Sequence, residues 1–175
     1  MMKPFRYLWA ITQCAFRNDA GAVGTWKIYA KAKQYLGAGT ITLGAGVFKM
    51  SLHKTSASAA IIVLSTRSTF ASIGSEISAR GGYVAGGRNL LPATGQWTVG
   101  ASAKQYKFTY STVGLVFTAS GSSLINIRFA LIRNSTGAGA GKVLCFASLS
   151  SAQFTIASPN TLSIMPAATG CFTLA

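Results

Sequence analysis

Very few side chains in this sequence could carry acid–base or metal chemistry. Asp19 and Glu76 are its only carboxylates, and His53 is its only imidazole. A carboxylate pair for glycoside hydrolysis would need both carboxylates together, and the three or four ligands of a catalytic metal would need all three residues or more, so this set leaves nothing to spare for either site. A nucleophile would need His53 as its base, but His53 ends a predicted strand beside Lys54, which indicates a surface or edge position. We therefore predict that the chain is not an enzyme and binds no cofactor.

The cysteines and the glycine-rich run suggest no site either. Cys14, Cys145 and Cys171 are odd in number, widely spaced and without a C-x-x-C pair, so we expect buried reduced thiols. The run GAGAGK at 137–142 looks like a phosphate-binding loop, but its spacing is wrong and Val143 follows the lysine in place of Ser or Thr. We predict a turn between two strands there, because small residues permit positive φ.

Positive charge is the strongest functional signal. The 175 residues include 16 Lys and Arg against 2 Asp and Glu, a net charge of +14 at pH 7, while 50% of residues are hydrophobic. Such an apolar chain is expected to fold, and cations on a folded body repel one another unless an acidic partner neutralises them. The cations that we expect to contact a partner are Lys3, Arg6 and Arg17 near the N-terminus, and Lys27, Lys31, Arg80 and Arg88 in the body.

The elements that position these groups divide the chain into two parts. Residues 1–24 form an N-terminal arm; its apolar stretch is similar to a signal peptide, but Gln13 and Arg17 interrupt it and no A-x-A site follows. Residues 25–175 form one domain, as the length predicts. It begins with an amphipathic helix near 25–36, ended by Gly37.

Beyond that helix, short β-type runs separated by Gly, Ser, Asn and Pro predict a mainly β fold, an antiparallel β-sandwich or jelly-roll. In 105–110 the residues Tyr106, Phe108 and Tyr110 alternate with polar ones, and 124–132 is expected to be one strand. We predict a surface excursion with one helical turn over 56–82, and no segment is long and apolar enough to span a membrane. The other predicted strands are 47–52, the region of Tyr83 with 90–91, 113–118, 142–146, 154–156, 161–165 and 171–174.

Several of these segments occur in an order that resembles a family of small virion proteins of tailed bacteriophages. Members of that family carry an F-K-V-A-L-like strand, a G-Y-x-x-G-G turn, an R-Y-A-V-I-like strand and a terminal G-x-F-x-L pattern. The matching segments here are FKMSL (48–52), GGYVAGGRNL (81–90, after Glu76), IRFALI (127–132), KVLCF (142–146) and GCFTLA (170–175).

The resemblance implies a non-enzymatic β-rich subunit, present in many copies in a virion. The implied role is a capsid cement or decoration subunit bound to the major capsid protein and to its own copies; the alternatives are a tail, neck or portal-associated component, or a basic nucleic-acid-binding protein, with contact to packaged DNA possible. Arg133 and Asn134 stand where the family commonly has an acidic residue, which leaves the docking surface open. The residues that match the family turn are Gly82, Tyr83, Gly86 and Gly87, with Tyr83 expected to anchor the turn in the core.

Overall fold

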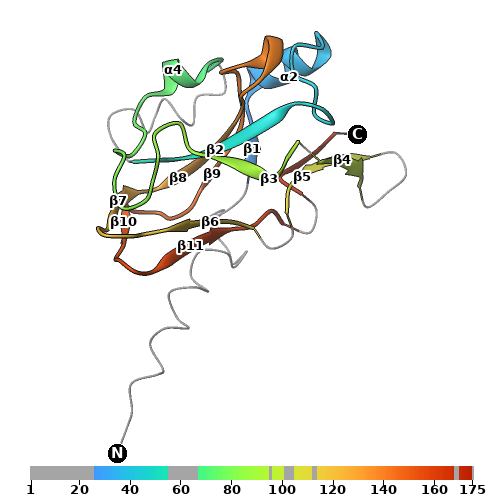
Figure 1. Cartoon of the computed structure of the whole chain (residues 1–175). Helices are drawn as coiled ribbons and strands as arrows, with labels where there is room; N and C mark the ends of the chain where they lie inside the picture. Colours follow the sequence, from blue (N-terminus) through green and yellow to red (C-terminus); the bar gives the residue numbers. More distant parts are fainter. Residues whose placement is uncertain are drawn as a thin grey trace, which may run out of the picture.

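Antiparallel strands are the main regular secondary structure of the described residues (Figure 1). The structure is a computed structural model, and it describes residues 26–54, 67–94, 96–100, 105–111, 114–167 and 170–174. Within these ranges the predicted fold class is confirmed, because several antiparallel sheets stack in a sandwich-like arrangement with one short helix of more than a single turn. The predicted arm, residues 1–24, lies outside the described residues.

A five-stranded antiparallel sheet, which we call the main sheet, forms the centre of the fold. Its strands, in spatial order, are β1 (Trp26–Ile28), β9 (Val143–Ser148), β8 (Phe129–Asn134), β2 (Val47–His53) and β3 (Arg88–Thr94). Almost every side chain of β2, β8 and β9 is buried. Continuous apolar runs of this length predict strands that are covered on both faces, and the main sheet is covered in this way.

Smaller sheets cover one face of the main sheet and form the second layer. Two aromatic contacts join the layers: the rings of Phe48 and Phe108 lie 5.0 Å apart, and those of Trp26 and Tyr110 lie 6.5 Å apart. The second layer consists of β12 (Phe172–Leu174), β5 (Tyr106–Thr109) and β4 (Gln96–Val99) in that order, of β6 (Leu115–Thr118) with β11 (Thr161–Ile164), and of β7 (Leu124–Ile127) with β10 (Phe154–Ile156).

Two helices cover the opposite face. They are α2 (Ala30–Gly37) and the single turn α4 (Phe70–Ile73). The ring of Tyr29, just before α2, lies 5.1 Å from Phe146 of β9, and Phe70 of α4 lies 5.9 Å from His53 of β2. Figure 1 shows both helices on the upper side and β6 and β11 on the lower side. The main sheet is therefore the middle of three layers.

The helix predicted near 25–36 begins later than expected. Residues 26–28 form β1, which pairs Trp26 with Ala147 and Ile28 with Cys145 of β9, and α2 then runs from Ala30 to Gly37, the predicted end. Aromatic and β-branched side chains favour a pleated surface, and the neighbouring strand supplies backbone partners that local periodicity cannot reveal. Lys27 consequently belongs to a strand.

The strand predicted over 124–132 is two strands. Asn126, inside β7, has a φ of +62°, which breaks the alternation. The two strands separate at Arg128: β7 pairs with β10, and β8 belongs to the main sheet. In β5, Phe108 is buried as predicted and so is Tyr110 beyond its end, but Tyr106 is 46% exposed. The run at 137–142 contains the 3-10 turn η1 (Gly137–Gly139) between β8 and β9, with positive φ at Gly137 and Gly141.

The excursion predicted over 56–82 is only partly at the surface. Residues 55–66 lie outside the described residues, and α4 is the expected single helical turn. Ile73 and Ile77, however, are 1% and 5% exposed and belong to the core. The segment 69–77 is therefore packed on the main sheet, because its apolar side chains cover the face of β2 that the second layer does not reach.

Candidate functional site

Ser51 and His53 form a hydrogen-bonded pair that resembles a nucleophile with its base. Ser51 Oγ lies 2.9 Å from His53 Nε2, and His53 Nδ1 lies 2.9 Å from the carbonyl oxygen of Gly74. Because a carbonyl only accepts, Nδ1 donates to Gly74 and Nε2 accepts from the Ser51 hydroxyl. Both residues are 0% exposed, and the Phe70 ring lies against the imidazole. No substrate can reach this hydroxyl in the folded chain.

The burial of His53 corrects the expectation of a surface or edge position. β2 lies between β8 and β3, so its last residue has neighbours on both sides: His53 pairs with Phe129 and, through an isolated bridge, with Glu76. Burial lowers the pKa of His53 to about 4, while the hydrogen bond to Gly74 acts in the opposite direction. The imidazole is therefore neutral at neutral pH and adds nothing to the surface charge.

Glu76 is the one carboxylate among the described residues, and its role is structural. Its Oε1 accepts hydrogen bonds from the hydroxyl of Tyr83 at 2.6 Å and from the backbone N–H of Gly86 at 2.7 Å. The Tyr83 oxygen in turn accepts from the backbone N–H of Leu52 at 3.1 Å. These partners occupy one carboxylate oxygen with internal donors, so Glu76 is not available as a general acid or base.

This hydrogen-bond chain closes a gap along the edge of β2. Strand β3 pairs with β2 as far as the Met50–Arg88 partners, and beyond the gap Lys54 N–H donates to the carbonyl of Ser75. The Leu52 N–H would otherwise lack an acceptor, and a buried unpaired N–H costs about 1–3 kcal/mol. The Tyr83 hydroxyl supplies that acceptor, and Glu76 orients the hydroxyl.

The family-like turn carries Tyr83 to this position. Tyr83 is 4% exposed, and Gly82, Gly86 and Gly87 have φ of +80°, +86° and +76°. A Cβ on Gly87 would lie 2.0 Å from the carbonyl oxygen of Met50, so only glycine fits where the turn joins β3. The turn therefore attaches the chain to the main sheet and presents no ligand site.

Cations gather on the face of the main sheet that the helices cover. Side chains alternate along a strand, and Trp26, Met50 and Ile132 point into the core, so their neighbours Lys27, Lys49 and Arg133 point to the opposite face. Lys49 and Arg133 are direct cross-strand partners. We call this side, with α2 and α4, the helical face. Its cations are Lys27, Lys31, Lys33, Lys49, Arg67, Arg133 and Lys142.

Some of these cations are held by aromatic rings or backbone carbonyls. The Arg133 guanidinium lies 4.4 Å above the Phe70 ring and donates to the carbonyl of Gly86 at 3.1 Å, and burial lowers its pKa. Lys142 Nζ lies 5.0 Å from the centre of the Tyr35 ring in α2. Lys27, Lys31 and Lys33 are exposed. The helical face thus has both anchored and exposed positive groups, and among the exposed ones Lys31 donates to Gln34 at 3.0 Å.

The cations predicted to contact a partner fall on different parts of the molecule. Lys27 and Lys31 lie on the helical face, on β1 and α2. Arg88 pairs with the inward-pointing Met50 and donates to the carbonyl of Val116 in β6, so it lies on the side of the second layer. Arg80 is exposed beside Gly81, whose carbonyl accepts from the backbone N–H of Ser120 in the loop after β6. Three predicted cations, Lys3, Arg6 and Arg17, lie outside the described residues.

Sequence reasoning missed several members of the helical face. Lys49 was detectable in principle, because it alternates with Phe48 and Met50 in a run that predicts a strand. Arg133 and Lys142 follow no local pattern; they join the helical face only because β8 pairs with β2 and because residue 142 forms a bridge with Thr69.

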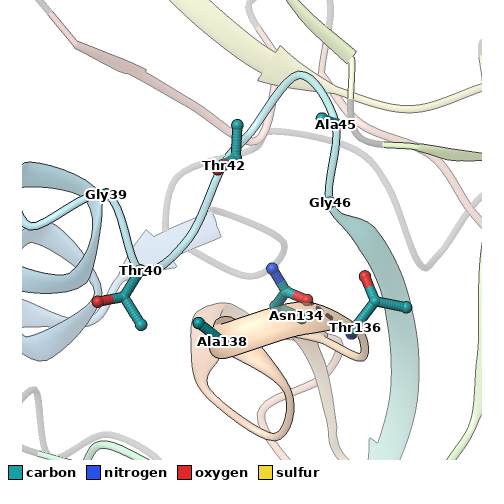
Figure 2. Close-up of a pocket in the computed structure, with 9 residues that line it drawn as sticks. Gly39, Thr40, Thr42, Ala45, Gly46, Asn134, Thr136 and Ala138 are labelled. Atoms are coloured by element: carbon teal, nitrogen blue, oxygen red, sulfur yellow. Dashed lines mark hydrogen bonds between the residues drawn. The ribbon is translucent and has the colours of Figure 1, made fainter.

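A shallow hollow of about 250 Å³ lies between the loop after α2 and the turn after β8 (Figure 2). Figure 2 shows Asn134 between the two walls, with its Oδ1 accepting from the backbone N–H of Thr136 at 2.8 Å. The lining offers small and uncharged groups, which supply no acid, base or nucleophile of perturbed pKa. The lining residues are Gly39, Thr40, Thr42, Ala45, Gly46, Asn134, Thr136, Gly137 and Ala138.

The described part of the chain contains neither a cluster of metal-ligating side chains nor a helix that could span a membrane. No three His, Cys, Asp or Glu side chains there lie close enough to hold a metal ion. No helix in those ranges has the length and apolar character to cross a bilayer. Comparison with protein-family models, curated proteins and solved structures finds no match to this chain.

Proposed function

We propose that this chain is a structural subunit of a bacteriophage virion, a capsid cement or decoration protein that docks through its helical face on an acidic surface of the major capsid protein. One observation carries the binding role: the helical face concentrates cations, and the only described carboxylate is engaged internally by Tyr83 and Gly86. The virion as its location rests on the sequence resemblance in the strands and the turn.

The electrostatics of the helical face favour association over catalysis. Uncompensated charge of one sign on one face raises the local potential and attracts a complementary surface, which increases the association rate. The groups that could do chemistry are inside: Ser51, His53 and Cys145 are each 0% exposed, and Cys171 is 5% exposed. The surface is therefore rich in cations, while the reactive groups are enclosed in the core. This combination suits a subunit that binds a partner.

Apolar side chains on the other side of the molecule support contacts between copies. Val99, Val116 and Met165 are 56%, 37% and 42% exposed. They belong to, or directly follow, the second-layer strands β4, β6 and β11. Subunits of an assembly bury apolar surface against their neighbours, and these strands are available for it.

Quantitative mass spectrometry of purified phage particles tests the virion assignment. Hundreds of copies per particle support a head-lattice position, whereas a copy number typical of a neck or tail ring would overturn the cement role. Absence of the chain from purified particles would overturn the virion role altogether.

Matched charge reversals test the helical face itself. Lys31→Glu changes an exposed cation on α2, and Arg80→Glu makes the same change on an exposed cation near the second layer. We expect Lys31→Glu to weaken binding to undecorated capsids several-fold at about 0.1 M salt and Arg80→Glu to leave it nearly unchanged, because exposed charges separated by more than about 10 Å are largely screened at that ionic strength. Equal losses would contradict docking through the helical face. Tight, steeply salt-dependent binding to DNA without capsid binding would favour the nucleic-acid alternative.

A further inference from the structure

Cys145 and Cys171 bring two thiols together across the interface between the two layers. Cys145 lies in the middle of β9, pairs with Ile28 of β1 and Ile132 of β8, and is 0% exposed. Cys171 directly precedes β12 and is 5% exposed. β12 contacts β1, the strand beside β9, so the two cysteines approach each other although about 26 residues separate them in the chain.

The contact between these thiols is direct. The Cys145 thiol has Cys171 as its side-chain hydrogen-bond partner, and burial raises the pKa of the Cys145 thiol. Tyr110 lies close to both cysteines, and its ring packs against Trp26 at 6.5 Å. Two hydrogen-bonded thiols inside an apolar enclosure are neighbours, and a disulfide requires that the sulfurs approach further, to a bond of about 2 Å.

We propose that Cys145 and Cys171 are a disulfide-forming pair that staples the five-stranded main sheet to the C-terminal strand of the second layer. Both are free thiols here, so the pair as described is the reduced form. The prediction of buried reduced thiols is confirmed for Cys145 and Cys171, and the proposed pairing does not rest on the proposed function.

The oxidant belongs to the class of small-molecule disulfides such as oxidised glutathione. The thiolate of Cys171 attacks one glutathione sulfur, which breaks the glutathione S–S bond, forms a mixed disulfide and releases one glutathione thiolate. The thiolate of Cys145 then attacks the Cys171 sulfur and releases the second glutathione. The protein loses two protons and two electrons, and one oxidised glutathione becomes two reduced ones.

The fold explains why Cys171 would react first. β12 is a three-residue strand at the edge of its sheet, bonded only to β5, whereas β9 lies inside the main sheet with β1 and β8 on its two sides. Short strands at the edge of a sheet open at lower free energy than strands in its middle. Opening of β12 exposes Cys171, and its return brings the mixed disulfide back to Cys145.

The test uses the full chain with Cys14→Ser, which leaves only the two cysteines of interest. One sample is incubated folded with oxidised glutathione, and another is unfolded in urea and refolded in a glutathione redox buffer, so that access cannot limit the reaction. We expect an intact mass lower by two hydrogens, a cross-linked peptide joining 145 to 171, and a Tm about 10 °C above that of the reduced protein, because the bridge closes a long loop.

The matched control carries Cys171→Ser in the same background and should show neither the cross-link nor a redox-dependent Tm. Both cysteines remaining open to alkylation after both treatments would overturn the proposal. Stable glutathione adducts on one or both cysteines would overturn it as well, because a neighbouring thiol would displace the glutathione and form the protein disulfide.

Discussion

Acidification is expected to weaken the folded state through a single residue, His53. The pKa of the buried ring is about 4, against about 6.5 in an unfolded chain, so protons bind the unfolded state preferentially between these values. The stabilisation by the neutral ring is complete above about pH 6.5 and is lost as the pH falls towards about 4. The difference between the two pKa values corresponds to about 3 kcal/mol in total.

The composition makes this effect unusually easy to isolate. Carboxylates dominate the acid unfolding of most proteins, but this chain has 2 Asp and Glu and 1 His. Between about pH 7 and pH 5 we therefore expect the free energy of unfolding to fall by about 2 kcal/mol, nearly all of it from His53. Urea unfolding at several pH values measures this loss, and NMR of the single imidazole reports its pKa without any assignment problem.

The matched variant for this experiment is His53→Gln, which removes the titration but retains polar atoms beside Ser51 and Gly74. Its unfolding free energy should be lower than that of the wild type at neutral pH and nearly constant over the same pH range. An imidazole pKa near the ordinary value in the folded chain, or an equal pH slope in the variant, would refute the reasoning.

The remaining predictions concern the turn that attaches to β2. Gly87→Ala is expected to lower the free energy of unfolding by more than about 3 kcal/mol, because its Cβ would meet the Met50 carbonyl. The matched control is Gly121→Ala, which has a positive φ but open space around it and should lower the free energy of unfolding by about 1 kcal/mol. Similar losses for both variants in urea unfolding would contradict the steric argument. Tyr83→Phe should cost about 1–3 kcal/mol, because it leaves the Leu52 N–H without its acceptor, and faster hydrogen exchange at Leu52 would accompany the loss. Glu76→Ala should cost at least as much as Tyr83→Phe and, in a double-mutant cycle with it, should show strong coupling; additive losses would mean that Glu76 does not act through Tyr83.

Local sequence pattern was sufficient to predict most of the strands and the residue at which the helix ends. Alternation in β5, the apolar run of β9 and the turn residues after β8 each predicted an element that the structure contains. These signals work because side-chain period and turn chemistry are properties of a few consecutive residues. The composition likewise limited the acid–base groups to 2 Asp and Glu and 1 His before any fold was known, because no arrangement can supply side chains that the chain lacks.

Only the tertiary structure decided which residues meet. His53 is buried because β3 and the segment 75–77 both pair along β2, and Trp26 to Ile28 form a strand because β9 offers them partners. The helical face and the thiol pair likewise join residues far apart in sequence. Pairing between distant segments is set by which strands become neighbours, and that choice depends on the whole core, whereas periodicity reports only on each segment alone.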